Sequence, residues 1–301
     1  MEKRSIIHML DPSPHNSPFD LNMAADAGFE VILPYSNVKL EEVNALVQDA
    51  IFSRGPAGVK RTALFIGGRD IRIAMDMMAA AKKAMVPPFE VSAFADPSGA
   101  FTTAAALVAC VEKQLKEKHG AELKGQRTIV FGGTGPVGIA TGVIASLAGA
   151  DTTIVDHLSI DTALQKADEY NKLCGSALKG TYASSEADKA RLISNADIVF
   201  CTAKAGVQVL SASVLADARQ LKVAGDVNAV PPLGIENVKL KDNGAPLSCA
   251  TQCPDAVGIG ALAVGNVKYQ LQNCLLTLML RTDKPVYLDF RRAFEKARGL
   301  V

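Results

Sequence analysis

One short stretch constrains the fold of this chain more than any other. Residues 127–131 read Arg-Thr-Ile-Val-Phe, a β-branched run that is typical of a buried strand. Directly after it, Gly133, Gly135 and Gly138 stand in the spacing Gly-x-Gly-x-x-Gly, and an apolar helical pattern follows. A strand, a glycine turn and a helix in this order predict a βαβ unit, whose helix covers one face of a parallel sheet.

The glycine turn also predicts a ligand. Gly133 permits a tight turn, Gly135 lets the backbone approach a pyrophosphate, and Gly138 allows the next helix to pack closely against the sheet. The helix N-terminus offers unpaired N–H groups and the positive end of its dipole to the phosphates. We therefore expect dinucleotide binding here rather than a glycine-rich turn without a ligand. The other residues expected to line this turn are Thr134, Pro136 and Val137.

An acidic residue after the next strand bears on which dinucleotide binds. The strand expected at 152–155 is followed by Asp156, 18 residues after Gly138. A carboxylate there accepts hydrogen bonds from the ribose hydroxyls, and it repels a 2′-phosphate by up to about 4 kcal/mol at ~4 Å and an effective dielectric of about 20. His157 follows, and no arginine comes close after it. The pattern favours NAD over NADP, unless Asp156 is an ordinary solvated acid at a strand end.

Elsewhere in the chain, short apolar runs alternate with helical patterns, which predicts parallel sheets covered on both faces. Before the glycine turn, strands are expected at 5–10, 29–33, 61–66 and 89–94, and helices at 19–27, 41–52, 70–86 and 101–117. After it, strands are expected at 152–155, 197–202 and 221–227. A long helix from Gly258 to about residue 280 follows, then a strand at 285–289 and a closing helix at 291–298.

These patterns indicate an α/β protein with two α/β domains. A Rossmann-type nucleotide domain with a parallel sheet is expected over residues 120–267. The substrate domain comprises residues 1–119 and is completed by the C-terminal residues 268–301.

Composition excludes several other classes. The 32 basic and 31 acidic side chains leave a net charge of +1, whereas a nucleic-acid-binding protein normally carries a basic excess. No apolar stretch is long enough to span a membrane. The six scattered cysteines are typical of a reduced, cytoplasmic compartment. Cys249 and Cys253 have no second ligand pair at zinc spacing, so no metal site is expected.

Several segments together resemble the bacterial methylene-tetrahydromethanopterin dehydrogenases, in order along essentially the whole chain. Two segments, Asp226–Ile235 with its Pro-Pro-Leu-Gly-Ile motif and Gly258–Lys268 with Gly-Ile-Gly, are more specific than the glycine turn. The other matching segments are Asp96–Ala106, Gly132–Gly138, Ser5–Leu10 and Ser17–Asp20. The last two resemble the branch that uses both NAD and NADP. The strictly NADP-dependent branch is expected to carry an arginine where this chain has Asp156-His157.

The resemblance implies a one-carbon oxidation. Methylene-tetrahydromethanopterin would pass a hydride to NAD(P)⁺ and give the methenyl compound, on the formaldehyde oxidation route of methylotrophic growth. Hydride leaves a carbon flanked by two nitrogens, whose lone pairs stabilise the cation, so the reaction needs no general base. NADP is expected to be used less well than NAD. Family analogy also implies a homo-oligomer, for example a trimer, with no nucleic-acid or membrane partner.

The resemblance further implies a set of pterin-facing residues. Lys268 would bond a pterin oxygen or orient a carboxylate, because a charged ammonium beside the cationic product is unfavourable; the alternative is a surface lysine. Asp20 would favour the developing cation, or else act only on the helix dipole. Thr102 and Thr103 would hold a polar ring edge, or else only cap the helix that they open, and Asp96 is expected to bind the substrate with them.

Polar groups at the ends of two later strands complete the expected cofactor site. Asp226 and Asn228 follow the strand at 221–227, and the amide of Asn228 suits a nicotinamide carboxamide, unless Asn228 is a turn residue. Thr202 and Ala203 end the preceding strand and would approach the cofactor through their backbone atoms. Two other functions remain open: a methylene-tetrahydrofolate dehydrogenase of similar build, and a non-enzymatic dinucleotide-binding redox sensor.

Overall fold

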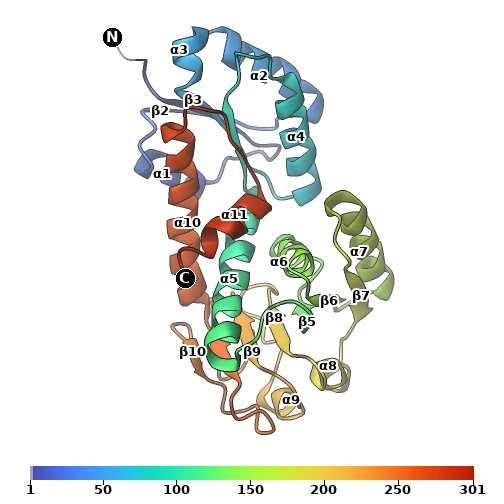
Figure 1. Ribbon diagram of the computed structural model, residues 1–301. Helices are drawn as coiled ribbons and strands as arrows, with labels where there is room; N and C mark the ends of the chain where they lie inside the picture. Colours follow the sequence, from blue (N-terminus) through green and yellow to red (C-terminus); the bar gives the residue numbers. More distant parts are fainter. Residues whose placement is uncertain (1–2) are drawn as a thin grey trace. The chain divides into compact units, whose positions relative to one another are not determined.

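The computed structural model describes residues 3–301, which divide into two compact units (Figure 1). Unit 1 comprises the described residues up to Thr102 together with Tyr269–Ala293. Unit 2 comprises Thr103–Lys268 and Phe294–Val301. Both units are α/β structures, which confirms the fold class expected from the alternation of strands and helices.

Unit 1 holds a parallel sheet in the order β12-β4-β3-β1-β2. Its strands are β1 Ile6–Leu10, β2 Val31–Tyr35, β3 Thr62–Ile66, β4 Ser92–Ala95 and β12 Tyr287–Leu288. The helices are α1 Pro18–Asp26, α2 Val43–Phe52, α3 Gly55–Val59 and α4 Ile71–Ala84, with short 3-10 turns η1 Leu40–Glu42 and η2 Pro97–Gly99. Every residue of β3 is buried, as expected for a central strand with helices on both faces.

Unit 2 holds a second sheet in the order β10-β11-β9-β8-β5-β6-β7. Its strands are β5 Arg127–Phe131, β6 Asp151–Asp156, β7 Lys179–Tyr182, β8 Ile198–Cys201, β9 Val223–Asp226, β10 Asn243–Pro246 and β11 Val257–Ile259. Its helices are α6 Pro136–Leu147, α7 Ile160–Cys174, α8 Glu186–Ile193 and α9 Ala212–Ala216. All pairs are parallel except β10 with β11.

The strand order of unit 2 determines where a ligand can bind. From β5, the next two strands in the chain, β6 and β7, lie to one side, and β8, β9 and β11 lie in that order to the other side. The antiparallel strand β10 adds an edge beyond β11. This is the 3-2-1-4-5-6 order of doubly wound folds, in which ligands bind at the carboxyl ends of the strands where the order reverses. The reversal lies between β5 and β8, and the glycine turn comes directly after β5.

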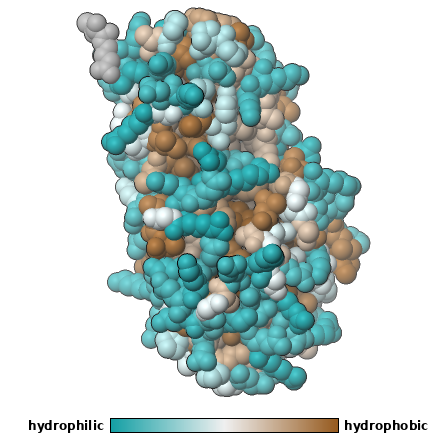
Figure 2. Space-filling model, in the orientation of Figure 1, coloured by the Kyte–Doolittle hydropathy of each residue, from teal (hydrophilic) through white to brown (hydrophobic). Residues whose placement is uncertain are grey.

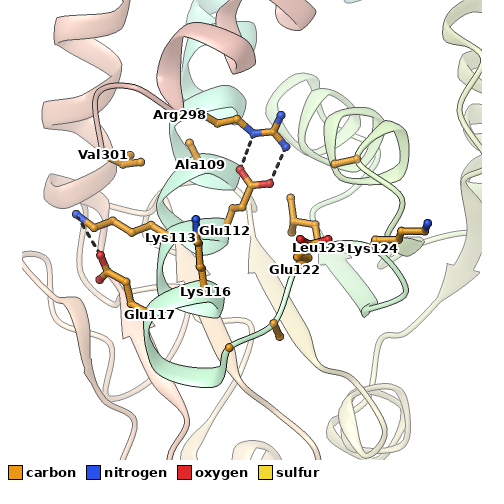
Figure 3. A pocket seen from close by; sticks show the side chains of 13 residues that line it. Ala109, Glu112, Lys113, Lys116, Glu117, Glu122, Leu123, Lys124, Arg298 and Val301 are labelled. Carbon is orange, nitrogen blue, oxygen red and sulfur yellow. Dashed lines mark hydrogen bonds and ion pairs between the residues drawn. The ribbon is translucent and has the colours of Figure 1, made fainter.

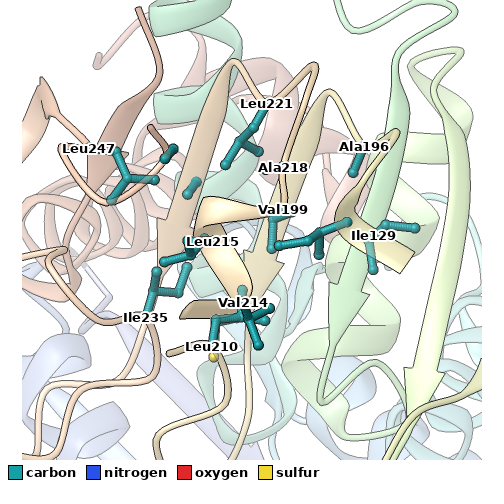
Figure 4. Close-up of a cluster of buried hydrophobic side chains, with 14 of the residues drawn as sticks. Ile129, Ala196, Val199, Leu210, Val214, Leu215, Ala218, Leu221, Ile235 and Leu247 are labelled. Carbon is teal, nitrogen blue, oxygen red and sulfur yellow. The ribbon is translucent and has the colours of Figure 1, made fainter. Parts of the chain in front are cut away.

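An apolar core holds this sheet together (Figure 4). Side chains from β5 and β8, such as Ile129 and Val199, pack with Val214 and Leu215 of α9 and with Leu247. The core therefore fixes β5 and β8 relative to each other, and with them the point where the strand order reverses.

Two helices, α5 Ala100–His119 and α10 Ala261–Arg281, run from one unit into the other. The expected domain boundary followed residue 119, whereas the units divide after Thr102. The reason is that α5 packs on the sheet of unit 2: a Cβ on Gly225 of β9 would lie 2.8 Å from Leu107 Cδ1, and Gly244 of β10 contacts the Gln114 side chain.

Two expected elements differ most from the structure in where they begin. The strand predicted at 89–94 begins only at Ser92, because Pro87 and Pro88 have no N–H to donate and the chain forms a Val86–Phe89 bridge around them. The helix predicted from Gly258 begins at Ala261, since residues 257–259 pair with β9 as β11. Gly260 then passes too close to the Lys239 carbonyl oxygen to carry a side chain. Among residues 3–301, no helix combines the length and the apolar character that crossing a bilayer requires.

Candidate functional site

The glycine turn after β5 has the geometry expected of a phosphate-binding turn. Gly132 has a φ of +69°, and a Cβ there would lie 2.6 Å from the Ala203 backbone nitrogen. A Cβ on Gly133 would lie 2.6 Å from the Val130 carbonyl oxygen, and one on Gly138 would collide with the Gly132 carbonyl oxygen. These three glycines are therefore required by the packing of the protein itself.

Gly135 differs from the other glycines of the turn. It is the N-cap of α6 with φ −79° and ψ 167°, a conformation that any residue adopts. A Cβ added there would meet only the Gly132 carbonyl oxygen, at 3.4 Å. Neither backbone strain nor packing requires glycine at this position, and the open space faces the N-terminus of α6. Thr134, Pro136 and Val137 lie beside this space in the same turn.

The end of β8 supports the turn from the side. The Thr202 hydroxyl donates to the Phe131 carbonyl oxygen at 2.9 Å, and the backbone of Ala203 lies against Gly132. Thr202 and Ala203 thus lie against the glycine turn, and the Thr202 hydroxyl holds β5 and β8 together. Their approach to a cofactor stays a prediction.

Asp156, at the end of β6, is bonded on both of its carboxylate oxygens. Its Oδ1 accepts from the backbone N–H groups of Leu158 at 2.7 Å and Ser159 at 2.8 Å. Its Oδ2 accepts from the Thr134 hydroxyl at 2.6 Å. Burial alone would raise the pKa of Asp156, but these hydrogen bonds, with a smaller contribution from the charge of His157, hold the pKa below its ordinary value. The group is therefore a carboxylate at neutral pH.

Apolar side chains next to Asp156 escaped the sequence analysis. His157 is exposed, and Leu158 exposes 76% of its surface. Ile160 and Leu164 on α7 expose 51% and 50%, and Figure 2 shows hydrophobic surface over this helix. Leu158 stands two residues after the strand-end acid, and apolar residues so close to an expected ligand site are the signal that would have pointed to them.

Asp226 and Asn228 are bonded within their own loop. The carboxylate of Asp226 accepts from the backbone N–H groups of Asn228 at 2.9 Å and Ile235 at 3.0 Å. Asn228 Oδ1 accepts from the backbone N–H groups of Gly206 and Val230, and its Nδ2 donates to the Pro232 carbonyl oxygen. These bonds order the segment that resembles the dehydrogenases. They engage the amide of Asn228 that was expected to bond a nicotinamide.

The burial of Asp226 also affects the groups around it. Burial raises the pKa of Asp226, and burial likewise raises the pKa of the Cys201 thiol, with the charge of Asp226 acting in the same direction. Cys201 is therefore a neutral thiol in the core and has no nucleophilic character.

In unit 1, Asp96 caps the helix that follows it. Its Oδ1 accepts from the backbone N–H groups of Phe101 at 2.9 Å and Thr102 at 3.1 Å. Its Oδ2 accepts from the Thr102 hydroxyl at 2.6 Å. Both Asp96 and Thr102 are completely buried, and Thr103 is half-buried. Helix capping, the alternative role given for Thr102, is thus present in the structure, with Asp96 as the capping residue.

Asp20 is bonded to a residue that the sequence analysis missed. The Gln272 side chain on α10 donates to Asp20 Oδ1 at 2.7 Å, and both residues are buried. Lys268, half-buried, lies four residues before Gln272 on the same face of α10. The i, i+4 spacing from Lys268, which places a polar residue on the same helix face, is the signal that would have identified Gln272.

Asp11 is a second buried carboxylate that the sequence analysis did not name. It follows β1, and its Oδ1 accepts from the Ser13 backbone N–H at 2.7 Å. A Cβ on Gly67 would lie 2.7 Å from Asp11 Oδ2. Asp11 and Asp96 thus both stand at the carboxyl ends of parallel strands of unit 1, where α/β sheets bind ligands.

Unit 2 also contains a hollow of about 880 Å³ that is lined by charged side chains. Arg298 donates to both carboxylate oxygens of Glu112 at 2.6 Å, and Lys113 pairs with Glu117 at 4.0 Å (Figure 3). Its lining residues 120–124 precede β5, so the hollow lies at the amino ends of the strands, away from the glycine turn. Within residues 3–301, no cluster of His, Cys, Asp or Glu could hold a metal ion.

Comparisons with known proteins agree with the sequence resemblance. A family model described as methylene-tetrahydromethanopterin dehydrogenase, N-terminal, matches residues 18–98. The chain is 46% identical over 297 residues to the NAD(P)-dependent methylenetetrahydromethanopterin dehydrogenase of Methylorubrum extorquens, with 98% of each chain covered. The chain belongs to the methylene-tetrahydromethanopterin dehydrogenase family. The chain is also 29% identical over 298 residues to a second protein of that organism, the bifunctional protein MdtA. The match covers 99% of each chain.

Solved structures share the fold of this dehydrogenase-family chain. Shikimate 5-dehydrogenase from Listeria monocytogenes, in complex with shikimate and NAD, gives a TM-score of 0.55 at 15% identity, covering 97% of this chain and 96% of the other. Quinate dehydrogenase from Corynebacterium glutamicum, in complex with NAD, gives 0.56 at 15% identity, covering 97% and 98%. At such identities the likeness shows the two-sheet α/β fold alone.

Proposed function

We propose that this protein oxidises methylene-tetrahydromethanopterin to the methenyl compound, with NAD(P)⁺ as the hydride acceptor. The observation that carries the proposal is the 46% identity, over 98% of both chains, to an enzyme of that name. The glycine turn, with its open space at Gly135 and the carboxylate at Asp156, supports the dinucleotide part of the proposal independently.

The dinucleotide is assigned to unit 2, at the carboxyl ends of β5, β6 and β8. Its pyrophosphate would lie over Gly135, where the N-terminus of α6 supplies N–H groups and a favourable dipole. Its adenosine ribose would bond Asp156, and its adenine would lie against Leu158. Other residues proposed for this site are Gly133, Thr134, Pro136, Val137, Gly138, His157, Thr202, Ala203, Asp226 and Asn228. For the last two, their hydrogen bonds favour contact through the backbone of the loop that they order.

The pterin-facing groups are proposed to be Lys268 and Asp20, with Asp96, Thr102 and Thr103 on the same substrate side. The Gln272 bond fixes the carboxylate of Asp20, so its charge can be held toward a developing cation. The bonds between Asp96 and Thr102 support a role in shaping the start of the helix on which Thr103 lies. The substrate domain would then correspond to residues 1–119 and 268–301, and the nucleotide domain to 120–267.

The chemistry asks little acid–base work of the protein. Bound NAD(P)⁺ supplies the hydride acceptor, and the lone pairs of the two nitrogens beside the reacting carbon stabilise the cation. The residues of this chain orient the two partners and exclude water from the reacting carbon. Asp20 lowers the energy of the positive charge, and Lys268 acts by bonding a pterin oxygen or by orienting a carboxylate, since an ammonium beside the cation would oppose the reaction.

The cellular setting is proposed from the cysteines and from the family. The six cysteines are free thiols, which is in line with a reduced cytoplasm. Family analogy supports a homo-oligomer and a role in formaldehyde oxidation during methylotrophic growth. We propose preferential use of NAD over NADP because Asp156 is ionised at the expected ribose position.

The test is an activity matrix of two substrates and two cofactors. Methylene-tetrahydromethanopterin and methylene-tetrahydrofolate are each mixed with NAD⁺ and NADP⁺, and nicotinamide absorbance is followed. The expected result is the highest kcat/KM for methylene-tetrahydromethanopterin with NAD⁺. Higher efficiency with the folate substrate would identify a methylene-tetrahydrofolate dehydrogenase. Dinucleotide binding without turnover of either substrate would identify a redox sensor.

A further inference from the structure

The bond between Thr134 and Asp156 joins two loops that lie far apart in the sequence. Thr134 belongs to the glycine turn after β5, and Asp156 ends β6, 22 residues later. The threonine hydroxyl has a single proton, and it is donated to Asp156 Oδ2 at 2.6 Å. This position of the turn, between Gly133 and Gly135, needs no hydroxyl for the turn itself. Its side chain is therefore placed to act on the carboxylate.

The bonding pattern leaves Asp156 little freedom. Oδ1 already accepts two backbone N–H groups, from Leu158 and Ser159, which is its full capacity. With Oδ1 fixed, the carboxyl group can still swing about that atom, and only the Thr134 bond fixes the position of Oδ2. Oδ2 accepts one hydrogen bond and can accept a second, so it is the oxygen of Asp156 to which a ribose hydroxyl could donate. The side chain exposes 6% of its surface.

We propose that Thr134 is a positioning residue for cofactor choice, because its hydroxyl holds Asp156 Oδ2 where a 2′-hydroxyl donates to it and a 2′-phosphate is repelled. This inference rests on the dinucleotide site proposed above. Without the hydroxyl, Oδ2 turns away from an incoming phosphate or takes a water molecule. As a result, the hydrogen bond from the 2′-hydroxyl of NAD⁺ to Asp156 weakens, and the repulsion of the 2′-phosphate of NADP⁺ decreases as well.

Few other charges act on this carboxylate. His157 follows it in the chain, and its charge favours the ionised form of Asp156. On the neighbouring elements, Tyr182 of β7 is its partner in the sheet register, and Asp161 lies in the first turn of α7. Helix α6 carries no charged side chain. The Thr134 bond is the largest influence that lowers the pKa of Asp156, so its loss raises that pKa.

The test compares Thr134→Val, which keeps the shape and removes the hydroxyl, with Thr134→Ser, which keeps the hydroxyl. The readouts are Kd for NADH and NADPH by calorimetry, and kcat/KM for NAD⁺ and NADP⁺ with the methylene-pterin. The expected result is a fall of about fivefold in NAD preference for Thr134→Val, the size of one lost hydrogen bond. Thr134→Ser and the exposed control Thr162→Val should stay within about twofold of wild type.

A double-mutant cycle separates positioning from direct contact. In an Asp156→Ser background, Thr134→Val should leave the preference unchanged, because there is no carboxylate to hold. An equal effect in both backgrounds would overturn the inference, since Thr134 would then touch the cofactor itself. An unchanged preference in Thr134→Val alone would overturn it as well.

The pH profile gives a second readout that a purely structural role would not move. A preference that depends on the Asp156 charge is present above its pKa and lost as the pH falls through it. In Thr134→Val this loss should occur at a higher pH than in wild type, and an unmoved profile would count against the inference. The Kd values need no turnover, so they test this inference separately from the proposed reaction. A protein that binds NADH but oxidises no pterin would refute the proposed reaction, and the Kd values of Thr134→Val would still decide this inference.

Discussion

Asp96 and Asp156 make almost the same bonds in different surroundings. Each carboxylate stands after a parallel strand, and each accepts two backbone N–H groups on Oδ1 and a threonine hydroxyl on Oδ2. The threonine that binds Asp96 lies on the helix that Asp96 itself caps, and both residues are fully buried. The threonine that binds Asp156 comes from the glycine turn of another loop, beside an open space.

The comparison teaches that the local bonding of a strand-end acid does not reveal its role. What separates the two is the origin of the third bond and the space around it. The bonds of Asp96 to Phe101 and Thr102 cap the helix that follows it, which is what a structural cap requires. Around Asp156 the bonds join the loops after β5 and β6, at the carboxyl edge of the sheet beside the point where the strand order reverses, and doubly wound sheets bind ligands at that edge.

The largest expected effect tests the open space at Gly135, in the glycine turn that bonds Asp156. Gly135→Val should weaken NAD⁺ binding by about 100-fold or more, because the side chain would occupy the phosphate position while the protein still folds. Calorimetry measures the Kd, and a thermal melt confirms folding. Gly138→Ala is the contrasting variant, and it should unfold because its Cβ has no room. Unchanged NAD⁺ affinity in a folded Gly135→Val protein would remove the cofactor assignment.

Asp96→Asn tests whether Asp96 acts as a structural helix cap. The amide offers an NH₂ group where the carboxylate accepted N–H and O–H donors, so buried donors lose their partners. The free energy of unfolding should fall by about 3 kcal/mol, measured by urea denaturation. The ratio of NAD⁺ to NADP⁺ use in the folded protein should not change. A stable variant with an altered cofactor ratio would contradict the distinction drawn between the two acids.

Asp156→Ser should change cofactor choice, which Asp96→Asn should leave unchanged. The NAD preference should fall by about 1–3 kcal/mol, or roughly 5- to 150-fold, because charge repulsion and the ribose contact are lost together. The measurement is kcat/KM for both cofactors. In the wild type the preference should persist at neutral pH and be lost only as the pH falls through the lowered pKa of Asp156. A ratio that does not move would show that Asp156 is not at the ribose.

The smallest expected effect concerns the pterin side. Lys268→Ala should raise the KM for the pterin or lower kcat by about tenfold, the size of one lost charged hydrogen bond, and leave NAD⁺ affinity nearly intact. Steady-state kinetics with varied pterin, together with the Kd for NADH, separates the two effects. If only the cofactor affinity changed, Lys268 would belong with Asp156 instead.

Patterns that depend on neighbours in sequence could be predicted, and those that depend on loop geometry could not. The glycine spacing and the strand-end place of Asp156 follow from local periodicity, and the structure has both. The Thr134–Asp156 bond could not be foreseen, because it depends on how two loops meet in space. The start of α10 was misplaced since a three-residue strand has too short a pattern to compete with an apolar helix.

The candidate site shows the same limit. The donor and acceptor of Asn228 suggested a cofactor contact from composition alone, whereas the structure uses them inside the loop. Gln272 was within reach of sequence reasoning by its helical spacing from Lys268, but its partner Asp20 lies about 250 residues away in the chain. Such distant pairs are fixed by the fold, which a local pattern does not contain.

The loop that Asp226 and Asn228 order has a thermodynamic consequence. It contains no regular secondary structure, yet the amide protons of Asn228, Val230 and Ile235 are all bonded to side chains. Such amides should exchange with deuterated solvent more slowly than those of an ordinary surface loop. A ligand that contacts this loop therefore binds to a surface whose backbone is already ordered. Binding then loses little of its free energy to freezing the backbone, and more of it remains for affinity.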